Sequence, residues 1–163
     1  MTPIILLDRL AEFVEKQTAN IILQVRTEPG VPQKERPAEV HKMRLPKKED
    51  NTKRIPYILL QILTGKDDTN NRGQKQSTCQ IRIVVGTYSE DENAGAYDVL
   101  NVILRIRTEL ERVGIIAEQF CLQDPLEYII YPDDYHPYYF GEMITNWTLP
   151  EIKQEVEELW LQE

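Results

Sequence analysis

The sequence predicts an α+β fold: a mostly antiparallel sheet of about four strands, with helices packed on one of its faces. Three observations predict it. Two runs rich in branched and aromatic residues, 55–63 and 79–88, are typical of strands. A polar, glycine-bounded connection at 65–73 joins them, as expected for antiparallel neighbours. The amphipathic segment 94–113 then has an apolar stripe wide enough for a helix buried against a sheet.

Length and composition limit the class of protein. At 163 residues the chain is expected to be one domain, 1–163. Its net charge of −8 argues against a protein that binds nucleic acid or anionic membranes through phosphate contacts. The two cysteines, without CxxC spacing, are expected as buried free thiols in a reducing compartment. Neither a secretion signal nor a membrane-length apolar run is found, so we expect a soluble, cytoplasmic protein.

The first elements along the chain are a helix and a short strand. Apolar residues recur at helical spacing over 4–16, with charged residues largely opposite, which predicts an amphipathic helix. The β-branched run 20–27 is typical of a strand. From residue 28 the composition changes, because 28–54 contains four prolines and residues 31–54 carry a net charge of +4.

The basic segment 28–54 is expected to be a long, flexible loop, since it is too polar for a core and broken by prolines. Three interpretations stay open: a solvated loop, an arm that orders against an acidic neighbour, or a direct contact with nucleic acid. The arm would use its basic side chains, and the candidates are Lys42, Arg44, Lys47 and Lys48.

The second half of the chain continues with one helix, three strands and a final helix. The helix 94–113 is expected to end at Gly114, a residue type favoured after a C-terminus. Short strands are predicted at 115–122 and 126–131, and a long one at 138–149, in which Gly141 marks a bulge or a close approach of neighbouring backbone. After Pro150 an acidic amphipathic helix is predicted at 151–161.

Motifs for catalysis are nearly absent from the sequence. It has no phosphate-binding glycine loop, no G-x-S-x-G turn and no zinc-ligand spacing. One group of residues, Asp133, Asp134 and His136, has the chemistry of a divalent-metal or acid–base site. The same residues in a proline-bounded turn are typical of an exposed loop, which we favour. We therefore expect no enzyme, no catalytic residues, no cofactor and no metal.

Aromatic residues gather near and along the strand 138–149. Strand alternation cannot place Tyr138, Tyr139 and Phe140 all on one face, so at least one must meet a covering helix or another chain. Packing within the domain and a subunit interface both remain open. The aromatic interface candidates are Tyr135, Tyr138, Tyr139, Trp147 and Trp160.

The order of several segments also indicates a family. They are LPKK (45–48), IPYILL (55–60), IVVGTYS (83–89), GAYDVLNVILRIR (95–107), PLEY (125–128) and HPYYFGEMITNW (136–147). As an ordered set over about residues 40–150, they resemble the tail terminator proteins of long-tailed bacteriophages and Gram-positive prophages. These proteins are also called tail completion or head–tail joining proteins.

The resemblance implies a small structural subunit without catalysis. Copies would form a ring, usually a hexamer, that caps the finished tail tube, ends its polymerisation and joins tail to head. The partners implied are the tail tube protein and the head connector protein, with DNA only as cargo passing through the ring. The expected location is the head–tail junction of the virion, after assembly in the host cytoplasm. An acidic channel wall would repel DNA phosphates, and the candidates to line it are Glu90, Asp91 and Glu92, or the C-terminal acids.

Three alternatives stay open at this stage. Another head–tail connector or neck component would share the ring and the lack of chemistry. A metal-dependent hydrolase would use Asp133, Asp134 and His136. A monomeric regulatory binding module would leave the basic segment disordered.

Overall fold

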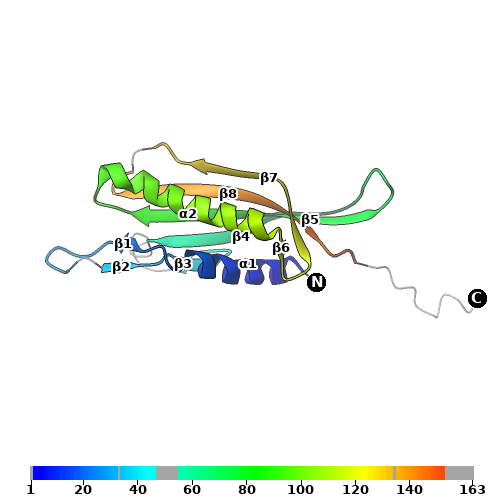
Figure 1. Cartoon of the computed structure of the whole chain (residues 1–163), viewed down its shortest axis with the longest axis horizontal. Coiled ribbons are helices and arrows are strands. Elements are labelled where there is room, and N and C mark those ends of the chain that lie inside the picture. The colour runs from blue at the N-terminus through cyan, green and yellow to red at the C-terminus, as the bar shows by residue number, and fades with distance from the viewer. Residues whose placement is uncertain (1, 33, 47–54, 134, 153–163) are drawn as a thin grey trace, which may run out of the picture.

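The computed structural model describes residues 2–32, 34–46, 55–133 and 135–152, which form two helices and eight strands. Their bounds are α1 Pro3–Thr18, β1 Leu23–Val25, β2 Lys34–Arg36, β3 Glu39–Lys42, β4 Tyr57–Thr69, β5 Lys75–Tyr88, α2 Glu92–Val113, β6 Ile115–Ile116, β7 Phe120–Ile130 and β8 Tyr138–Leu149. Six strands form one curled sheet in the order β3-β4-β5-β8-β7-β6, and β1 pairs with β2 in a separate small sheet (Figure 1).

The predicted sheet of about four mostly antiparallel strands is wrong. The main sheet has six strands and curls into a half-barrel, and it is mixed because β3 pairs in parallel with β4. A short strand, β3 or β6, lies at each edge. At one edge β3, from the segment expected to be a loop, runs parallel to β4 with Glu39 opposite Tyr57. Pro37 and Pro46 flank β3 without interrupting it, so the prolines do not prevent pairing. At the other edge β6 pairs with the start of β7.

The connection between β4 and β5 is also shorter than predicted. Residues 65–69 belong to β4, which runs on with the start of β5 as a long hairpin beyond the other strands (Figure 1). Its tip is a turn in which the Asn70 side chain accepts hydrogen bonds from the backbone N–H groups of Arg72 (2.9 Å) and Gln74 (3.0 Å). Gly73 has a φ of 77°, a conformation that glycine adopts at little cost. The side chains of 65–69 are exposed, but their backbone is strand rather than loop.

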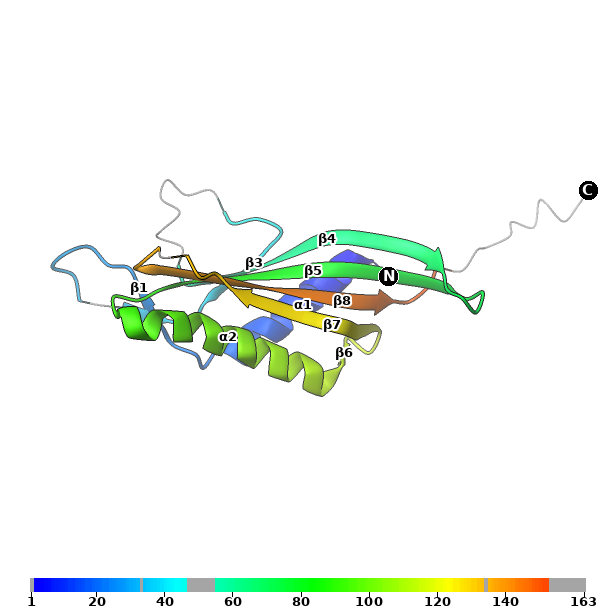
Figure 2. The same ribbon diagram turned by 90° about the horizontal axis from the view of Figure 1, so that it is seen from above.

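Both helices lie within two residues of their predicted bounds, and they cover the same face of the sheet (Figure 2). Gly114 ends α2 in a left-handed conformation, with its N–H bonded to the carbonyl of Leu110. The two edge strands β3 and β6 both contact α1, so the sheet curls around its helix-covered face. The opposite face of the sheet consequently points outward.

Gly141 was expected to mark a bulge or a close approach of neighbouring backbone; the pairing of β8 with β5 has no register shift there, and the atoms that approach most closely are side chains of α2, which crosses β8. A Cβ atom at Gly141 would lie 2.7 Å from Cδ1 of Ile103 and 2.9 Å from Cγ1 of Val99. It would also lie 3.1 Å from the backbone oxygen of Ile129 in the neighbouring strand. Ile103 and Val99 are fully buried, so the missing side chain lets the helix settle directly on the sheet.

Some predictions fall on residues that the structure does not describe. The C-terminal helix expected at 151–161 lies outside the described residues from 153 onward. The same holds for Lys47, Lys48, Asp134 and Trp160.

Candidate functional site

The start of α2 gathers several of the residues that the sequence singled out. Asp91 caps the helix, because its Oδ1 accepts a hydrogen bond from the N–H of Asn93 at 2.9 Å. The hydroxyl of Tyr88 donates to Oε1 of Glu90 at 3.1 Å, and the Tyr88 and Tyr138 rings lie 5.7 Å apart. The end of β5, the acidic turn 90–92 and the start of β8 therefore form one surface.

The neighbouring aromatic residues divide between the two faces of β8, as strand alternation requires. The Tyr139 ring lies on α2, since a Cβ atom at Gly95 would come within 2.1 Å of that ring. The Tyr139 hydroxyl is 2.8 Å from Nδ1 of His136. Tyr138 instead accepts a hydrogen bond from Nη1 of Arg26 at 2.6 Å. Tyr139 thus packs against α2 within the domain, whereas the side chain of Tyr138 lies on the other face of β8 and is partly exposed.

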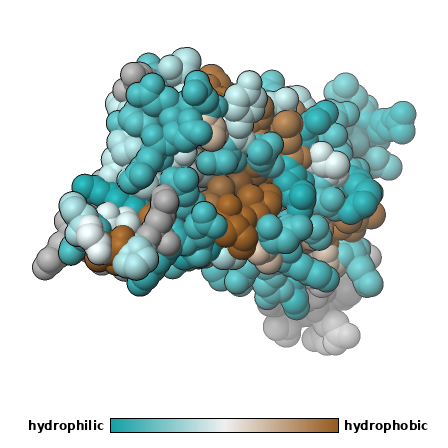
Figure 3. All heavy atoms as spheres, turned by 60° about the vertical axis from the view of Figure 1, so that its left-hand side comes forward, coloured by the Kyte–Doolittle hydropathy of each residue, from teal (hydrophilic) through white to brown (hydrophobic). Residues whose placement is uncertain are grey.

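The remaining predicted interface aromatics have different environments. Trp147 is 1% exposed and its Nε1 donates to Oγ1 of Thr145 at 2.8 Å, so it belongs to the core and is withdrawn as an interface candidate. Tyr135 is 56% exposed, and Tyr97, one turn into α2, is 66% exposed. In a view of this end of the molecule, hydrophobic residues gather near the centre and hydrophilic ones surround them (Figure 3). Among the predicted aromatic interface candidates in the described ranges, Tyr135 is therefore the most exposed.

The basic segment is partly tied to the body of the protein. Nζ of Lys42 lies 2.7 Å from Oδ1 of Asp8 on α1, and both side chains are about half exposed. An exposed pair of this kind contributes about 1 kcal/mol or less. Nη1 of Arg36 donates to the carbonyl of Pro56 at 3.1 Å. Arg44 is exposed. Of the predicted basic candidates, Arg44 is therefore the described residue best placed to meet another chain.

A hydrogen-bonded network on the outer face of the sheet was not predicted. Arg82 on β5 forms an ion pair with Glu142 on β8, and it donates to Gln61 on β4 at 3.3 Å. It also donates to the hydroxyl of Tyr131, just after β7, at 3.2 Å. Burial is the largest single effect and acts to lower the pKa of Arg82, but the hydrogen bonds and charge interactions with Glu142 and Tyr131 together outweigh it, so the pKa is raised. The network joins the strands and leaves the guanidinium fully charged.

The metal-dependent alternative receives no support from the described residues. His136 interacts with Tyr139, Asp133 lies in the preceding turn, and Asp134 is outside the described part. Within residues 2–32, 34–46, 55–133 and 135–152, no three histidine, cysteine or acidic side chains are grouped so as to hold a metal ion.

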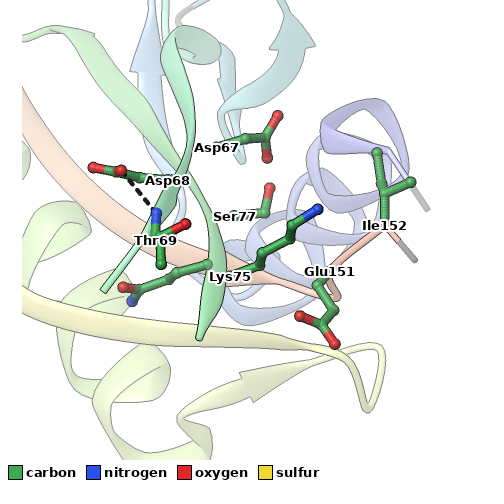
Figure 4. A pocket seen from close by; sticks show the side chains of 8 residues that line it. Asp67, Asp68, Thr69, Lys75, Ser77, Glu151 and Ile152 are labelled. Carbon is green, nitrogen blue, oxygen red and sulfur yellow. Dashed lines mark hydrogen bonds between the residues drawn. The ribbon is translucent and has the colours of Figure 1, made fainter. Parts of the chain in front are cut away.

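A pocket of about 380 Å³ lies where the long hairpin meets the end of the described chain (Figure 4). It is lined by Asp67, Asp68, Thr69, Lys75, Gln76, Ser77, Glu151 and Ile152. The pKa of Asp68 is lowered by a hydrogen bond with Lys66, as in an ordinary surface ion pair. The lining includes neither histidine nor cysteine.

Comparison with known proteins adds nothing to this geometry: no family model matches the chain, and no curated protein matches it. Among the described helices, none is long and apolar enough to cross a membrane. The exposed surfaces and the order of the sequence segments are therefore the remaining indications of function.

Proposed function

We propose that this chain is a structural protein of a bacteriophage or prophage tail. Copies of it would form a ring, hexameric as in the family that the sequence resembles, at the end of the tail tube. The ring stops further addition of tube protein and then presents a surface to the head connector. DNA passes through its hole as cargo, and the protein has no catalytic role.

The observation that carries the proposal is the incomplete pairing at both sides of the sheet. β3 pairs with β4 only as far as Leu60, so from Gln61 to Thr69 the side of β4 that faces away from β5 has no described strand beside it. On the other side β6 covers only Phe120 and Cys121 of β7. Strand edges left open in this way are ready to pair with another chain, as a subunit of a closed assembly requires.

The acidic turn at the start of α2 supports the idea of a channel that does not hold DNA. Glu90, Asp91 and Glu92 are all exposed. Asp91 caps the helix and Glu90 accepts a hydrogen bond from Tyr88, but all three carboxylates stay exposed and would face the hole of the proposed ring. Negative charge there repels the phosphate backbone and allows the DNA to slide.

The experiment that tests the proposal is a tube-capping assay. Tube protein from the same genome is polymerised with and without this chain, and tube lengths and ends are recorded by electron microscopy. The proposal predicts shorter tubes with a ring on one end. Tubes of unchanged length with bare ends would refute it. Binding to the head connector alone, without binding to tubes, would identify another neck component.

A further inference from the structure

A groove with apolar walls lies at the end of the molecule where α1 begins and α2 ends. It has a volume of about 570 Å³. Apolar side chains of three elements line it: Ile5 and Phe13 of α1, Val113 of α2, and Ile115 and Ile116 of β6. Ile5, Val113 and Ile115 are exposed. Exposed apolar side chains that gather around one groove are typical of a surface that another segment covers.

One polar atom in the groove lining is left without a partner. Gln119, in the turn between β6 and β7, also lines the groove. Its Oε1 is buried and accepts no hydrogen bond from any described residue. A buried acceptor of this kind costs free energy unless a donor reaches it. The occupant that suits the groove is therefore apolar and brings at least one N–H donor.

The segment that follows the described part of the chain, residues 153–163, has a sequence of this kind. Val156, Leu159 and Trp160 continue the apolar helical spacing that begins at Ile152. Tryptophan combines a large apolar ring with an N–H group that finds a hydrogen-bond partner when it is buried. Trp160 therefore supplies both properties that the groove calls for.

The groove is within reach of this segment. Ile115 pairs with Cys121, and Cys121 pairs with Thr148, so Ile115 lies two strands from Thr148 in the sheet. Paired Cα atoms are about 5 Å apart, which places Thr148 about 10 Å from Ile115. The end of β8, the start of α1 and β6 also lie at the same end of the molecule in both ribbon views (Figure 1, Figure 2). Eleven residues follow Ile152, and they span about 16 Å as a helix or about 35 Å when extended.

We propose that residues 153–163 dock into the groove of their own chain. Trp160 packs against Val113 and Ile115. Its Nε1 donates a hydrogen bond to Oε1 of Gln119. The short tether keeps the segment at an effective concentration of about 1 mM, so weak contacts suffice to hold it there in preference to the same segment of a second copy. The docked segment closes the groove to other chains, and the inference does not rest on the proposed function.

Trp160 is itself the probe, because the chain has one other tryptophan, Trp147, which is buried in the core. Acrylamide quenching of tryptophan fluorescence is measured on the full-length chain. The signal of a Trp160→Phe variant is subtracted, which leaves the signal of Trp160 alone. We expect Trp160 to emit at a shorter wavelength, and to have a quenching constant several-fold lower, than in the same protein unfolded in urea.

Ile115→Lys tests the groove. A charge among the apolar walls should displace the segment and raise the quenching constant of Trp160 toward its unfolded value. Ile129→Lys is the matched control, because Ile129 is 52% exposed against 51% for Ile115 and lies on β7, outside the groove lining. It should leave Trp160 protected. Circular dichroism checks that both variants fold.

Three results would overturn the inference. The first is a wild-type Trp160 that is quenched as strongly as in urea, which does not depend on whether a lysine variant folds. The second is an Ile115→Lys variant that behaves like Ile129→Lys. The third is protection that is lost over about a hundredfold dilution, which would place the segment on a second copy. The capping assay reads tube length instead, so its failure leaves this inference standing, and an exposed Trp160 leaves the proposed function standing.

Discussion

The contact between α2 and β8 at Gly141 can be tested with one methyl group. In Gly141→Ala the new Cβ lies 2.7 Å from Cδ1 of Ile103 and 2.9 Å from Cγ1 of Val99. Carbon atoms in ordinary contact are about 3.5–4.0 Å apart, so the helix or its side chains must move by roughly 1 Å. Val99 is β-branched in a helix and has little rotamer freedom, which leaves Ile103 or the backbone to shift.

The expected cost follows from these distances. Overpacking by one methyl group costs about 1–3 kcal/mol, and relief from the entropy of a strand glycine returns about 0.5–1 kcal/mol. We therefore expect a net loss of about 1–2 kcal/mol, or a fall in Tm of about 2–8 °C for a domain of this size. Urea unfolding followed by far-UV circular dichroism measures it.

Two further variants test whether the contact between α2 and Gly141 causes this loss of stability. Gly65→Ala is the control, because its Cβ would meet only the backbone oxygen of Thr78, at 3.8 Å, and should be neutral or slightly stabilising. Ile103→Val removes the atom nearest to the new Cβ; alone it should cost about 0.5–1.5 kcal/mol, but less in the Gly141→Ala background. Two results would show that α2 does not pack directly on Gly141. One is a Gly141→Ala variant as stable as wild type; the other is a double variant whose loss of stability equals the sum of the Gly141→Ala and Ile103→Val losses.

Three other predictions concern ionisable groups. Burial and the charge of Asp91 raise the pKa of Asp98 in the folded protein, so the ionised carboxylate destabilises the fold. Asp98→Asn should therefore raise the free energy of unfolding at pH 7, and this gain should disappear as the pH falls through the pKa of Asp98 in the folded state and then through its pKa in the unfolded state. Burial raises the pKa of Cys79 to about 11, so a thiol reagent at pH 8 should label at most Cys121 until urea exposes both. Arg82→Ala should cost about 1–3 kcal/mol in urea unfolding, and adding Glu142→Ala should cost less than its single effect; additive losses would contradict the pairing.

The helices and strands in which apolar residues recur at a regular spacing were predictable from the sequence. The stripe along α2 and its terminal Gly114 give the helix nearly to the residue, and the bounds of β8 agree with those expected. The edge strand β3 was not predictable, because it is too short to show the alternation of a strand. The strand predicted at 115–122 joined β6 to the start of β7. β3 has four residues between prolines, and it becomes a strand only because β4 offers a partner.

The candidate surface was predicted only in part. Trp147 was grouped with the other aromatics by composition, whereas its parity along β8 places it with Met143 and Thr145 on the buried face. The same alternation, with Arg82 between Ile81 and Ile83, could have indicated a polar network on the outer face.

Negative-stain imaging of the purified chain over a wide concentration range tests the central claim most directly. The account predicts closed rings with a central hole, in which the subunits can be counted. Single small particles at every concentration would contradict it.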